Sequence, residues 1–163
     1  MNESKLSHVD DSGHARMVDV STKPESRRVA VAEGLVVLRP EVLARLLSGD
    51  LPKGPVIETA RIAGIMAAKR TSDVIPLCHP IRLSEVDVRL APFDSSTLRV
   101  EATAIAMDRT GVEMEAMTAV AVAALTVYDM VKAVDRAAVI TGIRLIRKEG
   151  GKSGTYAADE VTP

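Results

Sequence analysis

The sequence predicts an α+β protein of the ferredoxin-like kind, in which an antiparallel sheet carries helices on one face. From residue 35 onward, strand-like and helix-like segments follow one another in the order β-α-β-β-α-β, if one short helix is set aside, and an N-terminal extension precedes them. The length of 163 residues suits a single domain, which we expect to span residues 1–163. With two Tyr, one Phe and a hydrophobic content of 47%, the core must consist of small and aliphatic side chains that allow close helix packing.

The chain begins with a polar, aperiodic arm, residues 1–16, which we expect to be flexible unless a partner or the site itself orders it. Two valine-rich segments follow, "MVDVS" (17–21) and "RRVAVAEGLVVL" (27–38). Their alternating or clustered valines are typical of strands. We therefore predict strands in both.

Two helices are predicted next. In "RPEVLARLLSGD" (39–50), Pro40 near the start and Gly49 at the end are typical helix boundaries. A second helix with a broad apolar stripe begins near Pro55 and continues until Pro76 ends it.

The second half of the chain contains the remaining elements. Strands are predicted in "EVDVRLAP" (85–92) and "TLRVEATAIAM" (97–107), because their apolar residues alternate, and the hairpin loop "APFDSST" joins them. The longest helix should run from about residue 112 to 134, and "TGIRLIRK" (141–148) should form the last strand. We expect the segment 155–163 to be flexible.

Composition argues against several classes of protein. The chain has one cysteine and no signal-like apolar run near its start, which predicts a cytoplasmic protein without disulfides. The longest uncharged apolar run, Ala116 to Tyr128, is shorter than the roughly 20 residues that span a membrane. A net charge of −1 offers no general attraction for nucleic acid. We expect neither a membrane nor a nucleic acid as partner.

The chain's only cysteine, Cys78, lies beside His79 between Pro76 and Pro80. A zinc site would need three or four ligands at recognisable spacing, so we expect no metal site. A catalytic dyad is disfavoured because neighbours on an extended segment point to opposite sides. Two interpretations remain: a small buried thiol beside a turn-capping imidazole, or a proline-held loop that presents a rigid edge to a ligand.

Charged residues mark both ends of the predicted long helix. Glu113 and Glu115 lie in its first turn, where carboxylates also complement the helix dipole. Asp129 and Lys132 are three positions apart near its end, as in an ordinary surface ion pair. They follow a run of Ala and Val that is typical of a buried segment, which favours a functional role for the pair.

Lysines and glycines coincide in "LPKGP", around Lys53, and in "RKEGGKSG", around Lys148 and Lys152. The second segment is similar to a phosphate-binding loop, but the leading glycine is absent and no helix follows. We therefore exclude an ATPase and expect these lysines to contact an anionic ligand.

Several long blocks resemble the molybdenum cofactor biosynthesis protein C family, whose members are cyclic pyranopterin monophosphate synthases. The blocks lie in order between about residue 5 and residue 154: "MVDVS", "ETARIAGIMAAKRTSDVIPLCHP", "TGVEMEAMTAV", "ALTVYDMVKAVD" and "GGKSG". The resemblance implies a ferredoxin-like fold. It also implies a lyase reaction that rearranges (8S)-3′,8-cyclo-7,8-dihydroguanosine 5′-triphosphate into cyclic pyranopterin monophosphate and releases diphosphate.

The resemblance further implies roles for individual residues. Asp129 corresponds to the family's catalytic aspartate, and Lys53 and Lys132 correspond to lysines that transfer protons and contact phosphate. Pairing with Asp129 would keep Lys132 protonated as a general acid, whereas burial would make it a base, and we favour the acid. The positions that match substrate-binding residues are Leu77, Cys78, His79, Glu113, Met114, Glu115, Lys148 and Lys152.

The family resemblance also implies an assembly. It is a homohexamer built as a trimer of dimers, with active sites at subunit interfaces and no tightly bound cofactor, so that magnesium enters only with the triphosphate. Glu115 and Asp129 are fourteen positions apart, which is roughly 21 Å along a helix, and this separation favours a shared site. The chain departs from the family at Val131, where Cys is frequent, and in its tail "KSGTY", where Asp-Phe usually follows the glycine.

Two other functions remain open. A ligand- or RNA-binding module could use the same fold, but RNA readers of this kind stack bases on aromatic residues of central strands. Here Phe93 lies in a predicted loop and Tyr128 on a predicted helix. A catalytically silent paralogue would have the same sequence features as an active enzyme.

Overall fold

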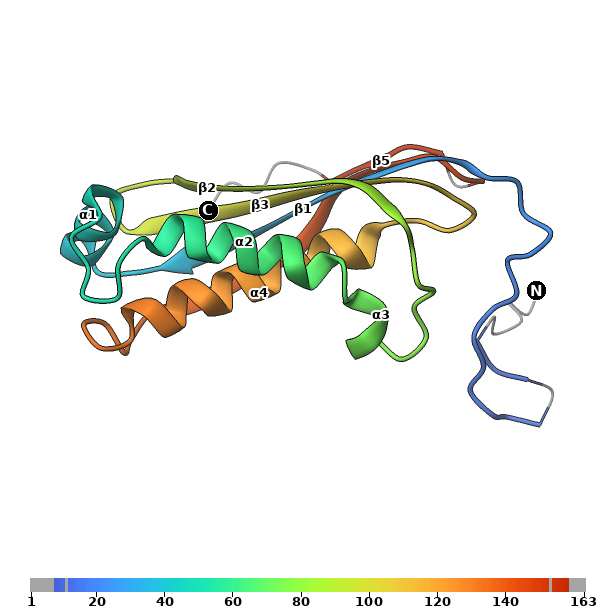
Figure 1. Cartoon of the computed structure of the whole chain (residues 1–163), viewed down its shortest axis with the longest axis horizontal. Helices are drawn as coiled ribbons and strands as arrows, with labels where there is room; N and C mark the ends of the chain where they lie inside the picture. The colour runs from blue at the N-terminus through green and yellow to red at the C-terminus, as the bar shows by residue number, and fades with distance from the viewer. Residues whose placement is uncertain (1–7, 11, 153, 159–163) are drawn as a thin grey trace.

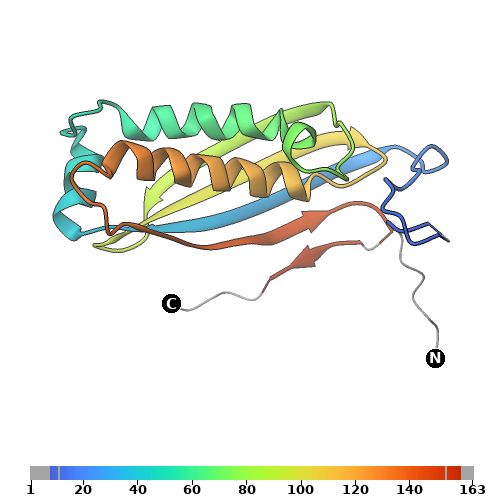
Figure 2. The ribbon, with the colours of Figure 1, turned by 90° about the horizontal axis from the view of Figure 1, so that it is seen from below.

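The computed structural model describes residues 8–10, 12–152 and 154–158. A five-stranded antiparallel sheet with strand order β2-β3-β1-β4-β5 carries the long helices on one face (Figures 1 and 2). This is the predicted ferredoxin-like arrangement, with two short helices and one short strand added. In chain order the elements are β1 (Ser26–Val37), α1 (Pro40–Ser48), α2 (Val56–Ala68), α3 (Thr71–Val74), β2 (Leu83–Pro92), β3 (Thr97–Asp108), α4 (Glu113–Val131), β4 (Val139–Glu149) and β5 (Tyr156–Ala157).

The central strand β1 pairs with β3 on one side and with β4 on the other, and these pairings fix which strand ends lie side by side. Its register with β3 pairs Ser26 with Asp108, and its register with β4 pairs Val29 with Glu149. The start of β1 therefore lies beside the ends of both β3 and β4. Helix α4 begins a few residues after β3, at the same end of the sheet, and this junction contains most of the site described below.

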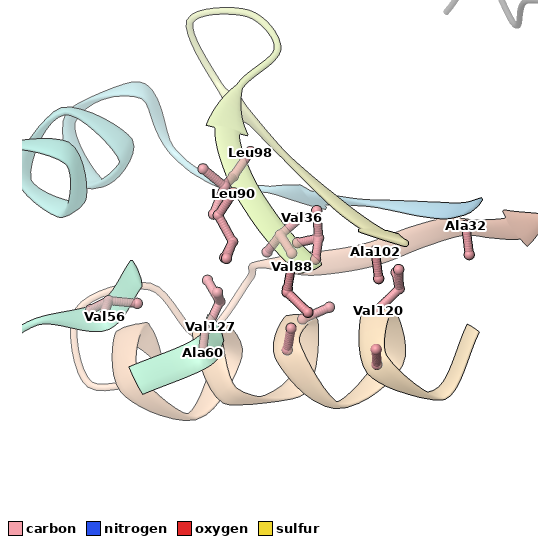
Figure 3. Packing of buried hydrophobic residues seen from close by; sticks show 14 of the residues in the cluster. Ala32, Val36, Val56, Ala60, Val88, Leu90, Leu98, Ala102, Val120 and Val127 are labelled. Atoms are coloured by element: carbon pink, nitrogen blue, oxygen red, sulfur yellow. The ribbon is translucent and has the colours of Figure 1, made fainter. Parts of the chain in front are cut away.

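The core between the sheet and the helices consists mainly of alanine and valine (Figure 3). Helices α2 and α4 approach closely at Gly64, where an added Cβ would lie 2.9 Å from the carbonyl oxygen of Ala119. At Gly34 on β1, an added Cβ would lie 2.7 Å from a methyl group of Val120. The predicted close packing through small side chains is confirmed.

The predicted strand at residues 17–21 is wrong, since this segment is irregular. The carbonyl oxygen of Val18 lies 2.7 Å from Nε2 of His79 instead of pairing in the sheet. The predicted second helix is also interrupted, because α2 ends at Ala68 and the separate turn α3 follows. At the break, the hydroxyl of Thr71 donates to the carbonyl of Ala68 (3.0 Å) and so competes with helix continuation.

Other boundaries differ by a few residues. Helix α4 ends at Val131, earlier than the predicted residue 134, and β4 extends the predicted 141–148 at both ends. Strand β5 was not predicted, and it places Tyr156 on a strand at the sheet edge. Among the described residues, α4 is the one helix long and apolar enough to cross a membrane, and half of it is buried against the rest of the chain.

The two chain ends have defined partners where the structure describes them. Val9 forms a bridge with Ala15, and β5 pairs with Arg147 and Lys148 of β4. The remainder of the predicted flexible ends, residues 1–7, 11 and 159–163, lies outside the described residues. Flexibility of the ends therefore stays a prediction.

Candidate active site

A cavity of about 420 Å³, called here the smaller cavity, lies at the start of α4. Its walls come from three segments that are far apart in the sequence: residues 8–10 and 12–23, called here the N-terminal arm, the loop that follows α3, and the start of α4. Six predicted substrate-binding residues line it, namely Leu77, Cys78, His79, Glu113, Met114 and Glu115. The structure thus brings the proline-bracketed loop and the acidic helix start together.

Glu115 is the most unusual group in the smaller cavity. Its residue is only 3% exposed, and its Oε2 atom has no hydrogen-bond partner within the described part of the chain. Burial raises its pKa to about 7, and the negative charges of Glu113 and Asp108 act in the same direction. A buried oxygen without a partner carries a desolvation cost, and a ligand with N–H donors would relieve it.

Cys78 lines the same cavity but is poorly suited to nucleophilic attack. Burial raises the pKa of its thiol, and the charge of nearby Glu115 raises it further. Because the thiolate is the reactive form of cysteine, this environment keeps Cys78 in its unreactive state.

Replacing Glu115 with Gln is expected to stabilise the protein at neutral and higher pH and to have little effect in acid. Because the folded-state pKa is raised from 4.5 to about 7, the wild type has its full stability below pH 4.5 and loses stability as the pH rises to 7. Gln does not ionise, so the variant should gain on the order of 2 kcal/mol above pH 7. Denaturant unfolding across this pH range measures the difference, and a difference that does not vary with pH would contradict the assignment.

A second cavity of about 600 Å³, called here the larger cavity, lies where β1 begins and where β3 and β4 end. It contains the predicted residues Glu113, Lys148 and Lys152, and Nζ of Lys148 lies 3.1 Å from Oε1 of Glu113. Five basic residues line it, against the two carboxylates of Glu113 and Glu149: Lys23, Arg28, Arg109, Lys148 and Lys152. Such a cluster is suited to an anion with several charges.

Three of these cations, Lys23, Arg28 and Arg109, were not among the predicted site residues. Lys23 and Arg109 stand between predicted elements, and Arg28 follows Arg27 at the start of a predicted strand, so no local pattern distinguishes them from solvated surface charges. The sheet register is what brings them together. The predicted strand order already places the start of β1 beside the end of β3, so the proximity of Arg28 and Arg109 could have been predicted.

Arg28 is held in place by the backbone of β3 and the segment that follows it. Its Nε donates to the carbonyl of Asp108 and its Nη2 to the carbonyl of Arg109, both at 3.1 Å. Its Nη1 fills the space where Gly151 has no side chain, because a Cβ there would collide with it. Gly151 also has a φ of 81°, which glycine adopts readily. The glycines of "EGGKSG" thus leave room for the side chain of Arg28, and the same segment carries Lys152.

The two cavities lie side by side and are together called the groove here. Lys23, Thr110, Gly111 and Glu113 line both of them. One half of the groove is basic, and the other half contains a buried acidic group, so the groove is suited to a molecule with a polyanionic end and a polar ring.

The three predicted catalytic residues form a separate cluster. Nζ of Lys53 lies 2.8 Å from Oδ2 of Asp129, and Nζ of Lys132 lies 2.7 Å from Oδ1. The hydrogen bonds from Lys132 and Lys53 lower the pKa of Asp129 to about 2, and Asp129 raises the pKa of Lys132. The predicted pairing of Asp129 with Lys132 is confirmed, and the contact with Lys53 adds a second cation.

This cluster lies at the opposite end of α4 from the groove. Figures 1 and 2 show the start of α4 beside α3, on the side of the N-terminal arm, and its end beside α1. Glu115 and Asp129 are separated by fourteen positions of continuous helix, or roughly 21 Å. One chain therefore does not bring all the predicted site residues together.

No metal centre is evident in the ranges that the structure describes. They contain no group of three or more His, Cys, Asp or Glu residues arranged to hold a metal ion.

Comparison with known proteins indicates the same family that the sequence blocks resemble. Residues 17–151 match the MoaC family. A cyclic pyranopterin monophosphate synthase of Roseiflexus sp. (strain RS-1) is 59% identical over 158 residues, which are 96% of this chain and 99% of that protein. Proteins of the same name from Thermomicrobium roseum and Brucella ovis are 56% and 57% identical, each over 96% of this chain and 95% of their own length.

Proposed function

The chain belongs to the MoaC family, and we propose that it acts as a cyclic pyranopterin monophosphate synthase in molybdenum cofactor biosynthesis. The reaction is the lyase step that converts 3′,8-cyclo-7,8-dihydroguanosine 5′-triphosphate into cyclic pyranopterin monophosphate and diphosphate. The family match carries this proposal, and the two-part groove supports it.

The groove has the chemistry that this substrate requires. A triphosphate carries about four negative charges, which suits the larger cavity with its five basic residues. The guanine-derived ring carries N–H donors, which suit the unpartnered oxygen of Glu115 in the smaller cavity. The shared residues between the cavities would lie beside the sugar-derived part of the molecule.

The cluster of Asp129, Lys53 and Lys132 would supply proton transfer and positive charge. Closing the cyclic phosphate forms a bond between a sugar hydroxyl oxygen and the α-phosphorus, and breaks the bond from that phosphorus to the diphosphate. Such a step depends on in-line positioning and charge neutralisation more than on covalent catalysis. Lys132, held protonated by Asp129, is suited to donate a proton or to stabilise the departing diphosphate.

An assembly is part of the proposal, because one chain separates this cluster from the groove. In a dimer, the end of α4 from one subunit would complete the groove of another. We further propose a cytoplasmic hexamer built from three such dimers, as the family resemblance implies. Magnesium would enter only with the triphosphate.

The direct test is to incubate the purified protein with the cyclised triphosphate and to measure pterin product and diphosphate. Formation of both in equal amounts is expected. Tight binding without product would instead support a silent paralogue or a ligand-binding module.

Replacing Arg28 with Ala is expected to raise KM at least about tenfold, because a charge-assisted hydrogen bond to phosphate is worth about 1.5–3 kcal/mol. Arg27→Ala is the matched control. Arg27 is the next residue on β1, its side chain is 59% exposed and 3.8 Å from Glu149, and it is not among the lining residues of the larger cavity. Steady-state kinetics on both variants, with melting temperatures as a check on folding, make the comparison. Equal effects of the two substitutions would remove Arg28 from the site.

A further inference from the structure

The N-terminal arm forms one wall of the smaller cavity. His8, Val18, Val20 and Lys23 of the arm line this cavity together with the loop after α3 and the start of α4. The arm runs past the end of the molecule where α4 begins (Figures 1 and 2). Without it, the cavity would be open on that side.

Two imidazoles contact the arm's backbone. Nε2 of His79 lies 2.7 Å from the carbonyl oxygen of Val18, and Nδ1 of His8 lies 3.3 Å from the carbonyl oxygen of Arg16. A carbonyl oxygen only accepts, so in each contact the ring nitrogen carries the hydrogen. The other nitrogen of each ring, Nδ1 of His79 and Nε2 of His8, has no hydrogen bond within the described residues and is available to a ligand.

The turn that connects His8 to Arg16 is organised by its own contacts. Oδ1 of Asp10 accepts hydrogen bonds from the backbone N–H groups of Ser12 and His14, each at 2.9 Å. Val9 and Ala15 form a bridge across the turn. These contacts keep His8 near the irregular segment 17–21, which His79 contacts at Val18, and they place the imidazole of His8 at the cavity.

We propose that the arm is a built part of the substrate site, that His8 contacts the ring portion of the substrate, and that His79 positions the arm through Val18. The proposal rests on the proposed function for the identity of the ligand. The free ring nitrogen of His8 accepts from a ring N–H when neutral and donates to a ring carbonyl when protonated. His79 contacts the arm and also lines the smaller cavity. A ligand that binds beside His79 therefore also affects how well the arm is ordered.

The first test compares His8→Ala with His14→Ala, using calorimetry of GTP binding to the full-length protein. GTP carries the triphosphate and the same ring edge as the substrate. His14 lies on the same turn, but its side chain is 79% exposed and does not line the cavity. We expect affinity to fall about tenfold in His8→Ala and to be unchanged in His14→Ala. Equal affinities in the two variants, or no GTP binding by the wild type, would overturn the contact.

The second test examines the positioning by His79 without any ligand. Trypsin should cleave after Arg16 slowly in the wild type and several-fold faster in His79→Ala, because the arm loses its hydrogen bond. His79→Gln retains an amide N–H that can donate to the carbonyl of Val18 and should restore much of the protection. Equal cleavage in all three proteins would overturn the positioning role. Absence of turnover with the cyclised triphosphate would contradict the proposed function and leave both of these comparisons valid.

Discussion

Subunits that carry Glu115→Ala and subunits that carry Asp129→Ala should each be nearly inactive alone and should regain activity when mixed. Each substitution removes one half of the site, and the loss of a proton-transfer or binding group is expected to lower turnover by about 10²–10⁴-fold. In a mixed dimer, one site lacks both groups and the other site is intact. Random exchange should therefore restore about one quarter of the wild-type rate.

The structure provides a matched control for this experiment. Lys53 and Asp129 belong to the same cluster on one chain, with Nζ and Oδ2 only 2.8 Å apart. A mixture of Lys53→Ala and Asp129→Ala subunits has no intact cluster beside an available groove in any mixed pair, so it should stay inactive. If the Glu115→Ala and Asp129→Ala subunits exchange but do not complement, the shared site is wrong.

Replacing Lys132 with Met should lower turnover by about 10²-fold or more, whereas Lys132→Arg should retain turnover within about tenfold of the wild type. The reason is the pairing in the structure, where Asp129 contacts Lys132 at 2.7 Å and raises its pKa. A residue that functions as a cation tolerates another cation, whereas a general base does not tolerate arginine, which stays protonated. Single-turnover assays at saturating substrate separate this effect from binding.

The pH dependence distinguishes the acid role from the base role. An inactive Lys132→Arg variant that binds substrate with wild-type affinity would overturn the assignment. A rate that rises with pH through an apparent pKa near neutrality, and that loses this rise in Asp129→Asn, would indicate that the paired groups titrate together as the base.

The fold followed from the sequence wherever one face of an element is buried. Alternating apolar residues in β2 and β3 and the alanine-rich run of α4 have the periodicity that burial against one core demands, and these elements were located within a few residues. The prediction failed at residues 17–21, where valine alternation is present without a neighbouring strand. No strand of the described residues pairs with this segment, and the carbonyl of Val18 lies 2.7 Å from Nε2 of His79 instead.

The eight predicted substrate-binding residues all line one of the two cavities, and the sequence offered them because blocks such as "IPLCHP" and "TGVEME" resemble one family. Their role in binding substrate stays a prediction. The pairing of Asp129 with Lys132 followed from helical spacing alone. Arg28 and Arg109 had no such signal. A single arginine at a strand end is an ordinary surface residue until the register of the sheet places it beside others.

The α+β class, the family and the local groups on each element follow from the sequence, since these depend on periodicity and on residue type over short spans. Which of these groups come into contact depends on how the chain folds. The antiparallel register of β1 with β3 and β4 places cations from different parts of the sequence around the larger cavity. The N-terminal arm packs beside the start of α4 and forms a wall of the smaller cavity. The length of α4 kept Asp129 away from Glu115, because a rigid helix of nineteen residues does not bend back on itself and its two ends must find their partners in different places.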